Sequence, residues 1–560
     1  MPTVDLGKIK LNWRGPYNSE TQYEADDVVS SDGSSFICVA SAPVTGTAPV
    51  AEQNTSTWEV MAAGVSPMDA QGQIVYQGAT GPEKLAPGTS GRLLTTRGAG
   101  ADPEWALPVS RQNSKVILLP ATDHIAGSYR SGGFVVADGT PRAWGRADNG
   151  NLGTGEFFSN RSTPVMPAIP RTTATITKWR RCGEDNWVVM SDGSVYVWGR
   201  NSYGSLGVGN TAVVTMPTKV VALDGVNIVD IAVGAGTNWP YNHAMFLAND
   251  GTMYACGYNG HGQLGLGDNT VRNTPTALTK TDWVFVKCAG TQYARTHAID
   301  TSGNLYSWGY QNHGELGDST TNVEAHEPQQ VTLPANASKV SACEDEHPAL
   351  NVHVGGHTLV LLTDGRVYSF GLNAQGQLGL GDNNNRSTPH HVSSLGTNNV
   401  EVFAAGGHWG FSVVQKSDGT IRTFGLNQSG QLGDGTSTNR NSPITPTGIE
   451  GRGGILKVLP FGGQTYNSIA VAFNDGSLMT VGYNANGNLG VGSTTNQTTF
   501  QDVPLMKDEV EDICCVGVNN EVGLGILTNA GIYYQTGYAG ESQLPKDDNE
   551  SSAVPMPVVS

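Results

Sequence analysis

The sequence predicts an all-β protein built mainly from one repeated unit, and three observations support this prediction. Glycine and proline are abundant, with 73 and 28 copies in 560 residues, whereas charged residues make up only 14% of the chain. Short apolar runs alternate with turn-forming residues, which is the pattern of many short strands. From about residue 113 to the end, three short motifs recur in phase every 52 to 62 residues. A period of this length is typical of propellers or arrays.

Residues 1–64 are predicted to form a small β module, in which aromatic side chains surround short strands. Trp13, Tyr23 and Trp58 flank two runs that meet at the turn Asp32-Gly33. We expect three strands with these aromatics as a minimal core, in preference to a platform for sugar stacking. The arrangement resembles the small chitin-binding-like modules that recur at the start of bacteriophage tail proteins. This resemblance implies an anchoring role for the module.

Residues 65–112 are predicted to form a glycine-rich stalk or linker. The segment is too short to hold a core of its own, so it gains stability by winding with copies of itself or by lying along a larger body. It resembles a stalk element common in bacteriophage tail-fibre proteins, which implies a trimerising or connecting role. A plain interdomain linker is the alternative. The residues that carry the resemblance are Gly72, Ile74, Tyr76, Leu85, Gly88, Gly91, Leu94, Pro103 and Trp105.

Residues 113–560 contain the repeats, and one well-preserved unit illustrates their design. Asp364-Gly365 is a two-residue hairpin turn between two short apolar runs, because both turn positions favour residues that tolerate φ > 0. The aromatic-glycine pair Phe370-Gly371 and the pair Leu378-Gly379 follow. A lone hairpin cannot bury its apolar face, so the unit needs neighbours. Eight copies of the three motifs are present.

The repeat resembles that of the regulator of chromosome condensation family, whose hallmark is Asp-Gly-x-Val-Tyr-x-Trp-Gly-x-Asn-x-x-Gly-Gln-Leu-Gly. The segments Ser191–Gly207 and Thr363–Gly379 match this hallmark nearly residue for residue. The resemblance implies a β-propeller with four strands per blade, usually with seven blades. The eight copies favour eight blades here, with seven blades plus an extra unit as the alternative. Propellers of four to eight blades all close sterically.

Charge and cysteine content exclude several partners. The chain has 32 basic and 49 acidic residues and a net charge of −17, which disfavours nucleic acid and anionic membranes as partners. No apolar run reaches the ~18 residues that a membrane-spanning helix needs, so we expect no membrane insertion. The N-terminus shows no secretory signal. Seven scattered cysteines indicate reduced thiols and synthesis in a cytosol.

The sequence predicts no catalytic residues, no cofactor and no metal site. The glycine-rich loops recur in every copy without a following helix, so they are structural and not phosphate cradles. The aspartates of the Asp-Gly pairs lie in separate hairpin turns. The insertion Glu344–His347, with His353 and His357 nearby, carries possible ligands for a divalent ion. Its spacing matches no known ligand motif, which favours a solvated loop.

The loops before the second strand of each copy vary most, and we expect them on one face beside the central channel. Their aromatic and amide side chains suit stacking on sugar rings or contact with a protein. Ordinary packing between blades is the alternative for any single residue. The receptor-binding candidates are Trp239, Tyr241, Asn242, Tyr293, Arg295, His408, Trp409 and Phe411.

The two N-terminal resemblances favour a bacteriophage tail fibre or receptor-binding protein. In this hypothesis the N-terminus attaches to other virion tail proteins, and the propeller loops recognise a host cell-surface receptor, either a polysaccharide or a protein. A homotrimer in the virion tail, assembled in the host cytoplasm, follows from the stalk resemblance. The alternative is a cellular propeller-type protein-interaction regulator, exchange-factor-like or inhibitor-like. A sugar-cleaving spike needs paired carboxylates, which the repeats do not offer.

Overall fold

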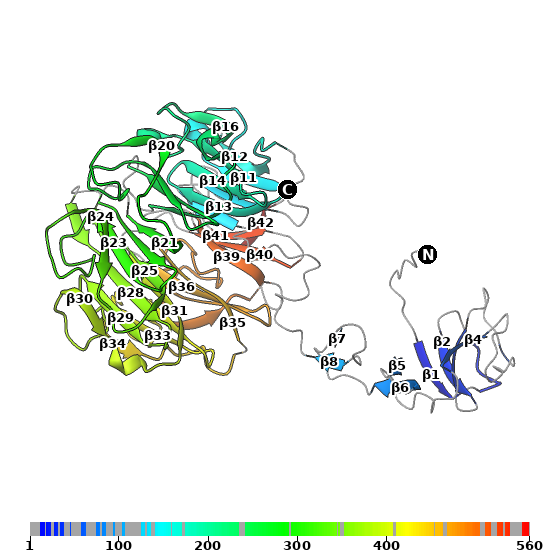
Figure 1. Ribbon diagram of the computed structural model, residues 1–560. Coiled ribbons are helices and arrows are strands. Elements are labelled where there is room, and N and C mark those ends of the chain that lie inside the picture. Colours follow the sequence, from blue (N-terminus) through cyan, green and yellow to red (C-terminus); the bar gives the residue numbers. More distant parts are fainter. Residues whose placement is uncertain are drawn as a thin grey trace. The chain divides into compact units, whose positions relative to one another are not determined.

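The computed structural model divides the chain into two compact units, Met1–Leu118 and Leu119–Ser560. Each unit is described by itself (Figure 1). The structure describes residues 12–16, 18–23, 27–31, 34–38, 45, 58–62, 74–78, 81–85, 93–95, 104–106, 125–128, 131–135, 140–157, 160–170, 174–234, 241–290, 293–343, 345–347, 352–406, 410–452, 454–462, 467–504, 510–516, 523–529, 533–537 and 552–558.

The first unit contains one four-stranded sheet and two hairpins. The sheet has one strand more than the three expected, and its first two strands are parallel. Tyr23 is buried, as predicted for the small core, and its hydroxyl accepts a hydrogen bond from the Asn18 backbone N–H at 2.8 Å. The sheet consists of β1 (Asn12–Pro16), β2 (Asp27–Ser31), β3 (Ser34–Cys38) and β4 (Trp58–Ala62), and the hairpins of β5 (Ile74–Gly78) with β6 (Gly81–Leu85) and β7 (Leu93–Thr95) with β8 (Glu104–Ala106).

The second unit is a β-propeller of eight four-stranded blades, each an antiparallel sheet. The prediction of eight blades is therefore confirmed. The first four blades are β9 (Ile125–Ser128), β10 (Ser131–Val135), β11 (Pro141–Gly145) and β12 (Arg161–Val165); β13 (Ile176–Cys182), β14 (Asp185–Met190), β15 (Val195–Gly199) and β16 (Val214–Lys219); β17 (Ile228–Val233), β18 (His243–Ala248), β19 (Met253–Gly257) and β20 (Arg272–Ala277); and β21 (Trp283–Ala289), β22 (Arg295–Asp300), β23 (Leu305–Gly309) and β24 (Ala325–Val331).

The remaining blades follow the same order, except that the fifth carries an inserted hairpin between its first two strands. Four short 3-10 turns lie in the connections, at η1 (Asp148–Gly150), η2 (Ser202–Gly204), η3 (Val221–Leu223) and η4 (Ser393–Leu395). The last four blades are β25 (Ala337–Ala342), β28 (His357–Leu362), β29 (Val367–Gly371) and β30 (Arg386–His391), with the hairpin β26 (Asp345–His347) and β27 (Val352–Gly355); β31 (Asn399–Ala405), β32 (Phe411–Lys416), β33 (Ile421–Gly425) and β34 (Arg440–Ile444); β35 (Ile455–Gly462), β36 (Asn467–Phe473), β37 (Leu478–Gly482) and β38 (Gln497–Asp502); and β39 (Val510–Val516), β40 (Gly523–Thr528), β41 (Tyr533–Gly537) and β42 (Ser552–Val558).

Each sequence motif has a defined place in the blade, as the fifth blade shows. Strand β28 is buried at all six positions because it lies between β25 and β29 and both of its faces meet neighbouring blades. The Asp-Gly turn joins β28 to β29, and Gly365 adopts φ +81° there. Leu378 is fully buried between blades, and Gly379 abuts the Phe424 ring of the next blade. The three motifs therefore build the blade and its contact with the next one.

The ring closes through side chains that join the first and last blades. Strand β9 contacts both β13 and β39, so the innermost strand of the first blade lies between those of its two neighbours. The rings of Trp144 and Tyr533 lie 4.6 Å apart, and Trp144 Nε1 donates to Gln535 Oε1 at 3.1 Å. Figure 1 shows the last blade beside the first. Apart from the inserted hairpin, each blade is formed by four consecutive strands, so packing and hydrogen bonds between blades close the ring.

Replacing Gly365 with alanine is expected to destabilise the propeller more than the same change at Gly419. Both glycines adopt φ near +80° in equivalent turns, which costs alanine about 1–2 kcal/mol. A Cβ at Gly365 meets the Thr397 carbonyl oxygen at 1.8 Å, whereas a Cβ at Gly419 meets nothing within 4 Å. The overpacking adds about 1–3 kcal/mol for Gly365→Ala alone. Calorimetric unfolding of both variants measures the difference, and equal losses contradict this account.

Candidate functional site

A continuous series of ring side chains lies on the face formed by the loops between the first and second strands and between the third and fourth strands of the blades. We call it the aromatic run. Neighbouring ring centroids in it lie between 4.9 and 6.3 Å apart, and all of its members are partly exposed. It spans the second, third and fourth blades. Its members are Tyr203, Tyr241, Tyr258, His261, Tyr293 and Tyr310.

The repeated loop after the third strand positions four of these six rings. Tyr258 and Tyr310 follow the glycine that ends the third strand of their blades, Cys256-Gly257 and Trp308-Gly309. Their backbone N–H groups donate to the carbonyls of Asn242 and Ala294, both at 2.9 Å. These bonds hold the loop after the third strand against the end of the loop before the second strand. The rings of both loops therefore come together.

An asparagine clamp makes the third-blade loop rigid. The Asn259 amide donates to the carbonyls of Asp268 at 2.8 Å and Thr270 at 3.1 Å. Its side-chain oxygen accepts from the Leu264 backbone N–H at 2.9 Å. Asn259 is fully buried, so this one side chain ties both ends of the loop to its middle. The aromatic residues around it are presented on a fixed backbone.

A carboxylate between two imidazoles borders the aromatic run. Glu324 accepts from, or pairs with, His261 Nδ1 at 2.7 Å through one oxygen and His326 Nε2 at 3.4 Å through the other. Burial, followed by the neighbouring Tyr241, raises the pKa values of the Tyr203 and Tyr258 hydroxyls. These phenols therefore stay neutral near pH 7 and can donate or accept hydrogen bonds. The site offers aromatic faces, hydroxyls and one acidic group.

The predicted loop residues have three different placements. Tyr241 and Tyr293 belong to the aromatic run. Asn242, Arg295 and Phe411 are buried, so they cannot contact a partner directly. The Asn242 amide donates to Asp185 Oδ2 at 2.9 Å, and Arg295 Nη2 donates to the Cys343 carbonyl at 2.7 Å. Trp239, His408 and Trp409 lie outside the described residues.

Sequence reasoning missed four members of the aromatic run because it treated the loop after the third strand as wholly structural. These members are Tyr203, Tyr258, His261 and Tyr310. A signal for them exists in the repeat, at the first and third variable positions of Trp-Gly-x-Asn-x-x-Gly. The residue after the first glycine and the residue before the second are aromatic or histidine in the third blade, whereas the fifth blade has Leu372 and Gln375 there.

The insertion with possible metal ligands and its neighbour His357 are only partly described by the structure. The residues that the structure describes contain no group of three or more metal-ligating side chains. The side chains of Glu344–His353 lie outside the described residues, although β26 and β27 pair as a hairpin. His357 is fully buried, and its Nε2 is 2.8 Å from Ser412 Oγ. Burial and the nearby Arg295 lower the pKa of His357 to about 3, so it is neutral. Among the described helical segments, none is long and apolar enough to cross a bilayer.

Comparison with known proteins decides the family. Residues 88–463 match the family described as the RCC1-like domain. The chain belongs to the RCC1-like domain family. This match confirms the propeller repeats that the sequence predicted. It begins inside the segment 65–112, which was expected to form a separate stalk or linker.

Several RCC1-like proteins are similar to this chain. The ultraviolet-B receptor UVR8 of Arabidopsis thaliana is 30% identical over 347 residues, which cover 60% of this chain and 72% of the receptor. The human E3 ubiquitin-protein ligase HERC2 is 26% identical over 358 residues, covering 64% of this chain but only 7% of the ligase. The yeast RCC1 protein Prp20, solved bound to Kap60, shares 20% identity over 64% of this chain and 80% of that one, with a TM-score of 0.47.

The predicted function as a bacteriophage tail fibre is wrong. The relatives that match over most of the propeller are cellular proteins of plant and animal, a receptor and a ubiquitin ligase. The predictions that depended on this function are therefore also wrong. They are the location in the virion tail, the virion tail proteins and the host cell-surface receptor as partners, and the homotrimer. The error has a physical source, since the N-terminal resemblances rest on short glycine and aromatic spacings that many small β modules and linkers share. The repeats specify the family over a far longer stretch.

Replacing the buried His243 with glutamine is expected to reduce the loss of stability in acid. Burial alone lowers the pKa of His243 to about 3, below its ordinary value of 6.5. Between pH 6.5 and about 3, His243 is therefore protonated in the unfolded chain but neutral in the folded chain. The free energy of unfolding consequently decreases as the pH falls through this range. This protonation lowers the free energy of unfolding by about 2 kcal/mol between pH 6.5 and 4.5.

Thermal unfolding of the native chain and the variant across pH 4.5–7.5 measures this effect. His390→Gln is the matched control, because His390 is exposed on β30. We expect the control to keep the native pH dependence and His243→Gln to show a shallower one. Identical pH profiles for all three proteins contradict a neutral buried His243.

Proposed function

We propose that this chain is a cellular propeller-type protein-interaction regulator and that its partner protein binds the aromatic run. The observation that supports this most is the continuous series of partly exposed rings on three neighbouring blades. Tyrosine is among the residues that dominate binding energy at protein interfaces. Single apolar side chains on a surface are common, but a contiguous aromatic patch indicates an interaction site.

The loop architecture supports tight binding at this surface. The aromatic side chains lie on loops whose backbone is already held by Asn259 and by the Tyr258 and Tyr310 N–H bonds. Binding of a partner therefore costs little conformational entropy in these loops, which favours a high affinity. Glu324 and the net charge of −17 favour a partner surface that carries arginine or lysine. Such cations can stack on tyrosine faces and pair with the carboxylate.

We propose further that the role is non-enzymatic. Among the described residues, the buried histidines His243, His297 and His357 have pKa values of about 3. A general base needs a pKa near the working pH, so these imidazoles are poorly suited to proton transfer. UVR8 is a receptor and HERC2 a ubiquitin ligase, which illustrates that the propeller alone does not choose the function. An exchange-factor-like and an inhibitor-like role both fit a binding surface of this kind.

The double variant Tyr258→Ser/Tyr310→Ser of the full chain tests the proposed surface. Partners are captured by proximity labelling in cells and their affinities measured with purified proteins. Val221→Ser is the control, because Val221 is 70% exposed and lies in the connection between the second and third blades, outside the aromatic run. Hot-spot residues contribute about 2 kcal/mol or more each, so we expect at least a tenfold loss of affinity in the double variant.

The control is expected to retain the partner at native affinity. A partner that binds the native chain, the control and the double variant equally contradicts the proposal, provided that the three proteins unfold at similar temperatures. A measured chemical turnover that survives in the double variant contradicts the non-enzymatic role.

A further inference from the structure

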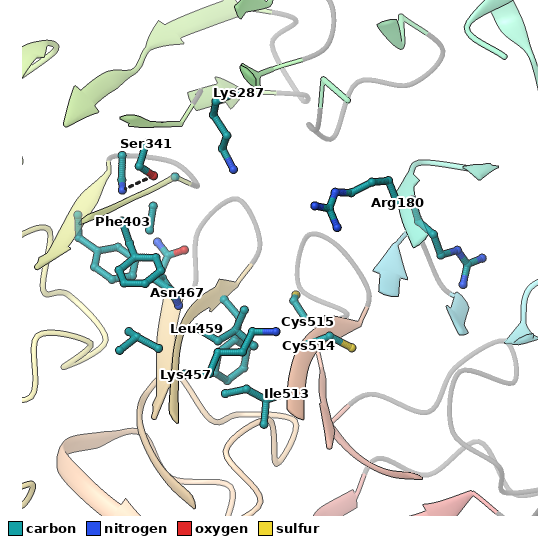
Figure 2. Close-up of a pocket in the computed structure, with 18 of the residues that line it drawn as sticks. Arg180, Lys287, Ser341, Phe403, Lys457, Leu459, Asn467, Ile513, Cys514 and Cys515 are labelled. Atoms are coloured by element: carbon teal, nitrogen blue, oxygen red, sulfur yellow. Dashed lines mark hydrogen bonds between the residues drawn. The ribbon is translucent and has the colours of Figure 1, made fainter. Parts of the chain in front are cut away.

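A cavity of about 740 Å³ lies at the centre of the propeller (Figure 2). Residues of six innermost strands line it, from β13, β21, β25, β31, β35 and β39. Small-molecule sites commonly have volumes of about 300–1,000 Å³. The lining shares no residue with the aromatic run. A ligand in this cavity would therefore occupy a second site.

Part of the cavity is a recess between the sixth and seventh blades. The innermost strands β13, β21 and β31 all have seven residues, and the sixth and seventh residues of β13 and β21 are buried. The corresponding residues of β31, Ala404 and Ala405, are only half-buried, as is Gly406 after them. All three line the cavity. These small residues leave space at an edge that is closed in the second and fourth blades.

The walls of the recess are mainly apolar. Phe403 and the fully buried Phe411 line it from the sixth blade. Leu459, Pro460 and Phe461 of β35 line it from the seventh blade. Three of these five side chains are phenylalanines, whose rings pack well against another aromatic ring. The recess therefore suits an aromatic ligand better than an inorganic ion.

The charges around the cavity favour an uncharged ligand in the recess. Lys457 is the charged residue that β35 contributes to the lining, and its ammonium group pairs with Asp512 of the eighth blade at 2.7 Å. The other charged lining residues belong to the second and fourth blades and are Arg180, Arg181 and Lys287. The recess itself thus carries no charge that a ligand would have to neutralise.

One polar side chain in the recess lacks a hydrogen-bond partner. Asn467, the first residue of β36, lines the cavity and is 1% exposed. Its amide nitrogen Nδ2 donates no hydrogen bond to any residue that the structure describes. A buried donor without an acceptor is costly, and an oxygen of a ligand would satisfy it. Figure 2 shows Asn467 on the same side of the open space as Phe403 and Leu459, away from Arg180.

We propose that the recess between the sixth and seventh blades binds a small uncharged aromatic molecule that carries an oxygen acceptor. The ring of this ligand lies against Phe403 and Leu459, and its oxygen accepts a hydrogen bond from Asn467. Apolar walls with few polar groups are typical of small-molecule sites, because the polar groups fix the orientation of the ligand. The site is independent of the surface proposed for a partner protein.

Titration of the full chain with acetophenone, followed by ligand-observed NMR, tests the site. Acetophenone combines a phenyl ring with a carbonyl oxygen, and α-methylstyrene is the matched probe because it has the same shape without the acceptor. We expect saturable binding of both. Asn467→Leu keeps the volume of the side chain and removes the donor. It is expected to weaken acetophenone at least fivefold and to leave α-methylstyrene unchanged or more tightly bound.

A second variant tests the location of the probes. Ala405 packs against the apolar cluster that the sixth and seventh blades share, so a larger side chain there fills the recess. Ala405→Leu is therefore expected to weaken both probes at least tenfold. Ala374→Leu is the matched control, because Ala374 is exposed and lies outside the lining. We expect it to bind both probes like the native chain.

Thermal unfolding shows which variants are folded before titration. Asn467→Leu stays decisive even where Ala405→Leu is destabilised, because it removes a donor that has no partner. An equal change for both probes in Asn467→Leu overturns the proposed hydrogen bond. Unchanged affinities in folded Ala405→Leu overturn the site, as does the absence of saturable binding of both probes to the native chain at millimolar concentration.

Discussion

The propeller depends on a hydrogen bond that most of its described blades donate to the blade before them. The backbone carbonyl just before the leucine of the Leu-Gly pair accepts this bond. The backbone carbonyl of Gln263 accepts hydrogen bonds from the Thr296 hydroxyl and the Trp308 indole N–H of the fourth blade, both at 2.9 Å. The carbonyls of Glu315, Gln377 and Asn488 accept in the same way from Thr358, Ser412 and Thr536 of the blades that follow them. These carbonyls are buried, so each missing donor would leave an unsatisfied polar group.

The same bond explains why variation is tolerated in some positions and not in others. Leucine, glycine and the hydroxyl or indole donors must stay in register for the ring to close. At two variable positions of the loop after the third strand, the side chains of the third and fourth blades are partly exposed, whereas Leu372 and Leu426 are buried at the first of these positions in the fifth and sixth blades. Tyr258 and His261 occupy them in the third blade, and Tyr310 occupies one in the fourth. The blades thus keep the same packing, while the residues at these variable loop positions can differ between members of one family.

Short motifs and long repeats had different value for predicting this protein. The spacing around Gly72 to Trp105 involves few residues, so unrelated linkers can share it, and it led to a wrong function. The repeat combines turn, strand and core positions eight times, which only a consistent packing of blades explains. Buried residues such as Arg295 and Phe411 were expected in loops that face a partner. They begin strands whose two faces are covered by neighbouring blades, which the local sequence does not reveal.

The sequence by itself determined the strands and turns of the propeller, the count of eight blades and the family, because each follows from contacts within one repeat or between adjacent repeats. Only the tertiary structure decided which variable residues meet. Tyr203 and Tyr310 belong to one surface although more than a hundred positions separate them. Contacts of this kind between distant residues depend on closure of the ring, and its geometry is a property of all eight blades together.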